Sequence, residues 1–99
     1  MIVLVATFQA KPGKEKVLEE KLKGLIPNVQ GEDGTIMYIL NRSASDSGAF
    51  LFYEMYKDKA SLDFHGSTTY FLDFINSVDD LIVGKPQLSF YEDIASIKY

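Results

Sequence analysis

Apolar and polar residues alternate along the chain in an order that predicts four strands and two helical regions. Residues 1–9 form an apolar run rich in β-branched side chains, which predicts a strand. After a proline–glycine break, apolar residues recur every three or four positions over 14–26, which predicts an amphipathic helix. Pro27 limits its regular continuation, although a loose further turn to Gln30 fits the pattern.

The middle of the chain predicts a hairpin followed by a short helix. Residues 35–42 and 49–57 form two strand-like runs, and the polar segment 43–48 between them reads as a loop. Asp58 is well placed as the N-cap of a helix, because its side chain can accept a hydrogen bond from a free backbone N–H. Residues 66–68, Gly-Ser-Thr, interrupt that helix.

The last third of the chain predicts one more helix and one more strand. The helix carries its apolar residues on one side, namely Phe71, Phe74, Ile75, Val78 and Leu81. Residues 84–86 end it, and 87–97 form a final strand with Leu88, Phe90 and Ile94 on one face. The resulting order, βαββαβ, predicts an α+β fold of the ferredoxin-like type, as one domain over residues 1–99.

Both faces of the predicted sheet are apolar. The first strand places Leu4 and Phe8 on one face and Val3 and Val5 on the other, and the hairpin repeats this pattern. Two helices can cover only one face, so the other would leave a patch larger than soluble monomers usually tolerate. We therefore expect a homodimer formed through the open sheet face. Hiding about 800 Å² per subunit would favour association by roughly 20 kcal/mol before entropic costs.

Composition and charge exclude several functions. The formal net charge is −4, Arg42 is the only arginine, and the lysines are scattered, so we expect no nucleic-acid partner. The chain has no cysteine and one histidine, which argues against a disulfide or a transition-metal site. It has no glycine-rich phosphate loop or dinucleotide fingerprint, so we expect no metal and no cofactor. The amino-terminal pattern predicts no signal peptide and no membrane span, which favours a soluble cytoplasmic protein without membrane contact.

Three segments carry a family resemblance. VATFQAKPGKEKVLEE, GTIMYILNR and FLFYEMYKDKASLDFH resemble the antibiotic biosynthesis monooxygenase family, and the likeness extends over essentially the whole chain. The resemblance implies a dimeric α+β barrel with a pocket between each sheet and its own helices. Some members of this family oxidise phenolic or quinol-type substrates with O₂ and without metal or flavin. Others isomerise small carbonyl compounds, including a phosphorylated quorum-sensing signal, and others degrade haem.

The chain departs from the family pattern in the run HGSTTYF. Relatives often have a second histidine where Tyr70 stands here, so a phenol replaces their second acid or base. Tryptophan is absent, whereas haem-degrading relatives rely on one, so haem degradation is disfavoured.

His65, Glu54 and Tyr70 are the candidate catalytic residues. As the only histidine, His65 is the obvious proton acceptor near neutral pH, although it could instead be a structural residue that caps a helix. Glu54 lies among aromatic residues and could orient His65 or bind substrate. Alternatively, it forms a dimer-interface or interstrand pair with Arg42 or a lysine. Tyr70 could donate a hydrogen bond to a substrate.

Further residues are candidates for binding a small apolar or aromatic substrate. Tyr53, Phe71 and Phe74 could line an aromatic pocket, although such residues also fill ordinary cores. Thr7 and Asn41 are polar positions late in apolar strands, where each could bond a carbonyl or phenol or simply satisfy a strand end.

Three functions fit these residues. The first is a cofactor-independent monooxygenase, in which a phenol or quinol loses a proton to His65 and the anion reduces O₂. The second is an isomerase of a small dicarbonyl, with Tyr70 or Glu54 steadying the enediol; a phosphorylated substrate would want more cations than Arg42. The third is a binding module that has lost catalysis.

Overall fold

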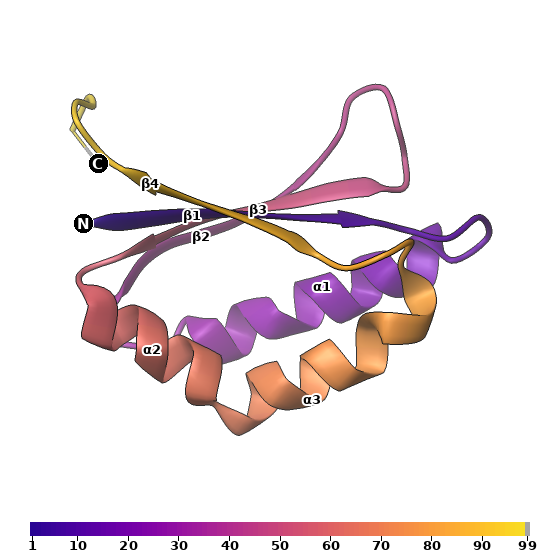
Figure 1. Ribbon diagram of the computed structural model, residues 1–99, viewed down its shortest axis with the longest axis horizontal. Coiled ribbons are helices and arrows are strands. Elements are labelled where there is room, and N and C mark those ends of the chain that lie inside the picture. The colour runs from indigo at the N-terminus through magenta and orange to yellow at the C-terminus, as the bar shows by residue number, and fades with distance from the viewer. Residues whose placement is uncertain (99) are drawn as a thin grey trace.

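A computed structural model describes residues 1–98 and places three helices against one face of a four-stranded antiparallel sheet (Figure 1). In chain order the elements are β1 (Ile2–Gln9), α1 (Glu15–Val29), β2 (Thr35–Arg42), β3 (Ala49–Tyr56), α2 (Lys59–Ser67), α3 (Thr69–Val78), the 3₁₀ turn η1 (Asp79–Leu81) and β4 (Gln87–Glu92). The strands lie in the order β2-β3-β1-β4. This arrangement confirms the predicted ferredoxin-like α+β fold.

Helix α1 continues past Pro27 to Val29, so the predicted further turn towards Gln30 is present. The predicted end of the last strand, in contrast, was wrong. Strand β4 ends at Glu92 and does not reach residue 97. It pairs only with β1, and that pairing stops where Ile2 faces Glu92, so the residues beyond have no neighbouring strand.

The pairing register decides which side chains face the helices. Leu4 of β1 lies opposite Glu54 of β3, and on its other side opposite Phe90 of β4. The neighbouring Val5 lies opposite Tyr53 and points to the other face. Even-numbered residues of β1 and β3 therefore face the helices, and odd-numbered residues face away.

The core fills the space between the helices and the sheet. Its fully buried helix residues include Leu18 and Leu22 of α1, which pack on the strand residues. Phe8 makes edge contacts with Phe52 and Phe74, with ring centroids 6.3 Å and 6.0 Å apart. Each such ring stabilises the fold by roughly 1.5–3 kcal/mol relative to an exposed one. No helix among residues 1–98 is both long enough and apolar enough to span a bilayer.

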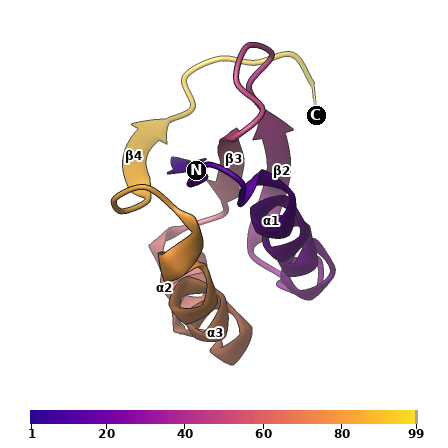
Figure 2. The ribbon, with the colours of Figure 1, turned by 90° about the vertical axis from the view of Figure 1, so that its right-hand side faces the viewer.

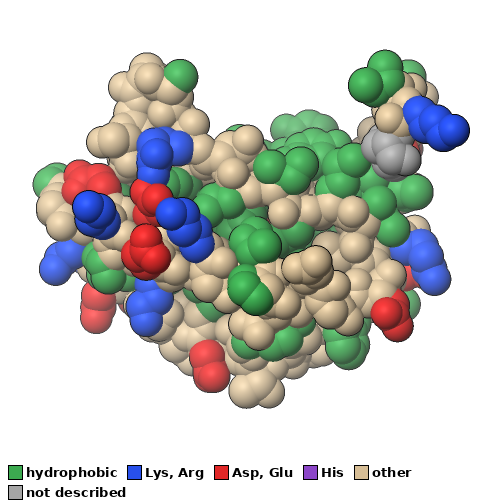
Figure 3. Space-filling view, turned by 180° about the vertical axis from the view of Figure 1, so that it is seen from behind, with side chains coloured by type: hydrophobic (Ala, Val, Ile, Leu, Met, Phe, Trp, Pro, Cys, Tyr) green, Lys and Arg blue, Asp and Glu red, His purple; other side chains and the backbone are tan. Residues whose placement is uncertain are grey.

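The opposite sheet face carries no helix, so the single chain forms an open sheet and not a closed barrel. Two projections rise from this face, the β2–β3 connection and the C-terminal segment (Figures 1 and 2). Residues 93–96 share a hollow with Val3 and Met55. Hydrophobic side chains gather between the two projections (Figure 3). The barrel implied by the family resemblance would require a second copy of the chain.

Candidate active site

His65 occupies the last turn of α2 and is only 2% exposed. The helix starts as predicted, with Asp58 accepting hydrogen bonds from the backbone N–H and the hydroxyl of Ser61 at 2.8 Å and 2.7 Å. Close approach to the 31–34 turn sets the helix position, since a Cβ on Gly34 would lie 1.9 Å from Ser61 Oγ. The N-cap and the contact with the turn thus fix the position of the helix that carries His65.

A cavity of about 630 Å³ lies beside His65, between the helix-covered sheet face and helices α2 and α3. Its walls are mainly aliphatic and aromatic: Leu4, Ala6, Phe8, Leu25, Tyr38, Phe52, Leu62, Phe71, Phe74, Ile75, Pro86, Leu88 and Phe90. Its polar lining comes chiefly from His65, Glu54, Asp63, Ser67 and Lys85. A predominantly apolar lining with a few polar groups is typical of small-molecule pockets.

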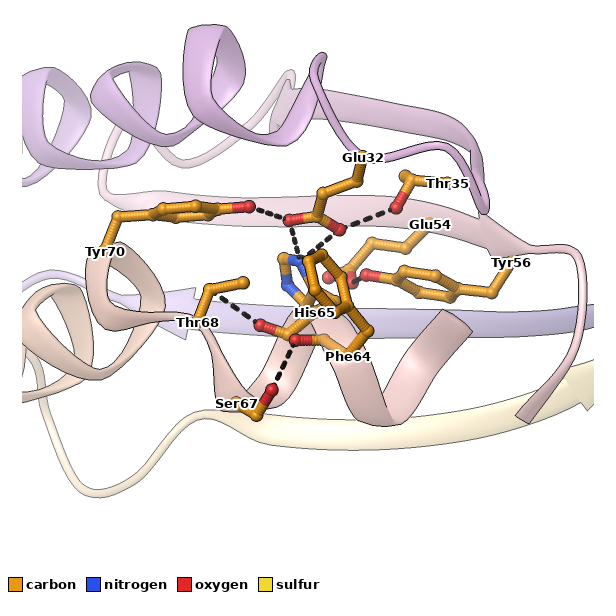
Figure 4. A network of polar contacts seen from close by, with 9 residues as sticks. All are labelled: Glu32, Thr35, Glu54, Tyr56, Phe64, His65, Ser67, Thr68 and Tyr70. Atoms are coloured by element: carbon orange, nitrogen blue, oxygen red, sulfur yellow. Dashed lines mark hydrogen bonds and ion pairs between the residues drawn. The ribbon is translucent and has the colours of Figure 1, made fainter. Parts of the chain in front are cut away.

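Glu32, a residue of the 31–34 turn, binds the imidazole. Its two carboxylate oxygens lie 3.1 Å and 3.0 Å from His65 Nδ1 (Figure 4). The Thr35 hydroxyl donates to one of these oxygens at 2.8 Å, and the Tyr70 hydroxyl donates to the other. Glu32 is buried, although its sequence context, an acidic residue in a turn between glycines, is typical of a solvent-exposed loop and so did not indicate a functional residue.

The other imidazole nitrogen has no partner. Among residues 1–98, His65 Nε2 is the only buried side-chain nitrogen or oxygen without a hydrogen bond. Leaving such an atom unsatisfied costs about 1–3 kcal/mol, so a site that retains it calls for an explanation. Rings surround the imidazole, with centroids of Phe71, Tyr38 and Tyr56 at 4.8, 5.4 and 5.5 Å.

Glu54 places a second titratable group in the cavity. Only 3% of it is exposed, and one of its oxygens accepts a hydrogen bond from Tyr56 at 2.5 Å. Burial raises the pKa of Glu54 to about 7; the charge of Glu32 adds to this rise, and the Tyr56 hydrogen bond opposes it. At neutral pH the group is divided between its acid and its carboxylate, so it can give or take a proton.

Two tyrosines near Glu54 stay neutral over the physiological range. Burial raises the pKa of the Tyr38 and Tyr56 hydroxyls, and the charge of Glu54 raises both further. Tyr38 lines the cavity. It is therefore available as a donor to a ligand.

The structure brings together His65, Glu54, Phe71 and Phe74, which all line the cavity. The hydroxyl of Tyr70 lies on Glu32 and is not part of the cavity lining. Glu54 does not contact Arg42, which pairs with Glu19 on the outside of the molecule.

Thr7, Asn41 and Tyr53 lie on the opposite sheet face, apart from His65. They line a separate hollow of about 880 Å³ beside the base of the β2–β3 connection. The reason is strand alternation: Thr7 and Tyr53 are odd-numbered positions, and Asn41 pairs with Leu51 on the same open face. A substrate in the His65 cavity would not touch them.

No cluster of three or more histidine, cysteine or acidic side chains within residues 1–98 is arranged to hold a metal ion.

Comparisons with known proteins agree on one family. The sequence profile described as "Antibiotic biosynthesis monooxygenase" matches residues 1–77. The chain is 29% identical over 82 residues to "Putative monooxygenase YcnE" of Bacillus subtilis, covering 83% of this chain and 86% of that protein. It is 28% identical to the uncharacterized protein sll1783 of Synechocystis, of whose length it spans only 62%.

Solved structures extend the likeness to the fold. The crystal structure of PA3566 from Pseudomonas aeruginosa has a TM-score of 0.89 and 30% identity, with 95% of this chain and 94% of that chain covered. Rv0793 from Mycobacterium tuberculosis reaches a TM-score of 0.91 at 23% identity over 98% of each chain, a likeness of fold alone.

Proposed function

Because the chain belongs to the antibiotic biosynthesis monooxygenase family, we propose that it oxygenates a small phenolic or quinol-type substrate without metal or flavin, with His65 as the proton acceptor. The observation that carries this proposal is His65 Nε2, a buried nitrogen without a partner on a residue that lines an apolar cavity. A neutral imidazole nitrogen is a suitable base for a phenol near neutral pH.

The reaction balances with O₂ as the only co-substrate. His65 Nε2 takes the proton of the substrate hydroxyl, and the anion passes one electron to O₂ to give a radical beside superoxide. Their recombination forms a C–O bond at a ring carbon that still carries hydrogen, and the imidazolium protonates the distal oxygen. Loss of the C–H proton then breaks the O–O bond, leaving a carbonyl on the product and releasing water. The substrate supplies all four electrons.

The cavity supports this chemistry in two further ways. Its apolar walls exclude water from the anion and the radical pair, which limits side reactions. Glu54 lies in the same cavity with a pKa near 7, so its carboxylate can accept the C–H proton and its acid form can deliver a proton to the departing oxygen. Phe71 and Phe74 provide ring faces for an aromatic substrate.

The isomerase alternative has less support when its substrate is phosphorylated. Lys85 is the only basic side chain in the cavity lining apart from His65, and Arg42 is held by Glu19 elsewhere. A binding module without turnover would use the same cavity. Assays that compare air with nitrogen distinguish these functions from oxygenation.

The decisive experiment measures turnover of a panel of quinols and fused-ring phenols under air and under nitrogen. His65→Asn is the informative variant, since asparagine keeps an N–H donor near Glu32 and lacks the second nitrogen. Asn76→Ala, an exposed position on α3, is the matched control. We expect O₂-dependent turnover that falls about 10²- to 10⁴-fold in His65→Asn, the usual contribution of a general base. Turnover that persists under nitrogen, or is unchanged in His65→Asn, contradicts the proposal.

The open sheet face supports a homodimer as the working form. Ile39 of β2 is 49% exposed there, and Ile94 and Ile97 of the C-terminal segment are 93% and 89% exposed. Exposed apolar side chains gathered between two projections are typical of a protein–protein interface (Figure 3). A second copy related by a two-fold axis would cover the face with the same residues from both chains.

A further inference from the structure

The contacts of Glu32 determine which imidazole nitrogen can carry the proton. Thr35 donates to Oε1 of Glu32 and Tyr70 donates to Oε2, while His65 Nδ1 lies 3.0–3.1 Å from both oxygens. An ionised carboxylate accepts hydrogen bonds and has none to donate. With two hydroxyl hydrogens already directed at it, Glu32 is best satisfied when Nδ1 also brings a hydrogen.

A neutral imidazole has one N–H and one bare nitrogen. If the hydrogen is on Nδ1, the bare nitrogen is Nε2, the atom that lacks a partner. With the hydrogen on Nε2, two unfavourable arrangements would arise together: a lone pair on Nδ1 would face the carboxylate, and a buried N–H would have no acceptor. The two observations therefore point to the same tautomer, although they concern opposite sides of the ring.

We propose that Glu32 is a positioning residue that holds His65 in the Nδ1–H tautomer, so that Nε2 faces the reaction as a base. Thr35 and Tyr70 hold Glu32 by donating to its two oxygens. Glu32 makes no ion pair with a lysine or arginine within the described residues, so these hydroxyls and the imidazole are its hydrogen-bond donors. The consequence for turnover rests on the proposed function, whereas the tautomer does not.

This assignment also gives Tyr70 a role. Its hydroxyl donates to Glu32 and so reaches the chemistry only through His65. Tyr70→Phe removes one donor and leaves the carboxylate in place, so the Nδ1–H tautomer should persist in that variant. Tyr70 is thus a support for Glu32 rather than a second acid that contacts the substrate.

The tautomer can be measured directly, because the chain has one histidine and its imidazole signals need no assignment. Nitrogen-15 NMR of the folded protein, recorded under conditions in which the spectrum itself shows a neutral ring, distinguishes a protonated from a bare ring nitrogen at each position. We expect Nδ1 protonated and Nε2 bare in the wild type and in Tyr70→Phe. In Glu32→Gln and Glu32→Ala we expect signal from the Nε2–H form. Glu20→Gln, an exposed glutamate on α1, is the matched control and should keep the wild-type spectrum.

Thermal unfolding checks that each variant is folded before its spectrum is used. A wild-type ring protonated at Nε2, or a folded Glu32→Gln and Glu32→Ala that both keep the Nδ1–H spectrum, overturns the proposal. Where a substrate has been found, Glu32→Gln should lower kcat roughly 10- to 100-fold with little change in KM, as for the partners that orient metal-bound histidines. An unchanged kcat in that variant overturns the positioning role. If no substrate is oxygenated, the NMR result still decides the tautomer. Failure of the proposed function can therefore be distinguished from failure of the tautomer assignment.

Discussion

Tyr56 donates its hydroxyl hydrogen to Glu54 at 2.5 Å, two residues away along β3 and on the same side of the sheet. Both side chains are buried on the helix-covered face. The hydrogen bond only partly offsets the cost of burying the carboxylate, so the pKa of Glu54 remains raised to about 7. This raised pKa couples the stability of the fold to pH.

Glu54→Gln should change the pH dependence of stability. The neutral acid is favoured in the folded state, so the contribution of Glu54 is fully present below its ordinary pKa near 4.5 and is lost as pH rises through about 7. The size follows from the shift and is about 3 kcal/mol. Urea unfolding from pH 4.5 to 8 should show the wild type losing stability relative to Glu54→Gln as pH rises. A constant difference between the two proteins would contradict the raised pKa.

Gly34→Ala should destabilise the protein because its Cβ would lie 1.9 Å from Ser61 Oγ and 2.3 Å from Ser61 Cβ. We expect a loss of about 1–3 kcal/mol, as for other overpacked sites. Adding Ser61→Gly to Gly34→Ala removes both clashing atoms, although it also removes the hydroxyl that bonds Asp58. A double-mutant cycle by urea unfolding should therefore show a favourable coupling, and strictly additive effects would exclude this contact.

Phe74→Ala should cost about 3–5 kcal/mol, since Phe74 is buried and packs edge-on against Phe8. The matched control is Phe64→Ala, an aromatic residue on α2 that is 58% exposed. Its loss should change the free energy of unfolding by less than about 1 kcal/mol. Chemical denaturation of both variants tests the contrast, and equal losses would mean that the buried face of α3 is misassigned.

Ile39→Lys should weaken self-association. Ile39 lies on the open face of β2, where a charge would be buried in the proposed dimer. Leu72→Lys, an exposed apolar position on α3, is the control and should leave association unchanged. Sedimentation velocity at micromolar concentration should show a dimer for the wild type and the control and a monomer for Ile39→Lys. A wild-type monomer would rule out the homodimer.

Much of the fold could be predicted from local patterns. The strand over 35–42, the Asp58 cap and the break after Ser67 all follow from rules that depend on neighbouring residues, and all are confirmed. The end of β4 could not be predicted in this way, because it depends on where β1 begins.

The site was less predictable for two physical reasons. The alternation of side chains along a strand placed Tyr53 and Phe52 on opposite faces of the sheet. Because both faces are apolar, the sequence did not show which of them the helices cover. The contact between Glu32 and His65 joins residues 33 positions apart, through a turn whose sequence resembles any polar turn. Only the packing of α2 against that turn makes Glu32 a partner of the imidazole.

Isotope labelling tests the central claim most directly. Turnover of an accepted quinol under ¹⁸O₂, followed by rapid quenching and mass spectrometry, should place one labelled oxygen in the product carbonyl and the other in water. His65→Asn should form little of this product in the same time. A product that carries no label under ¹⁸O₂, or one that forms equally fast in His65→Asn, would contradict an oxygenase that uses His65 as its base.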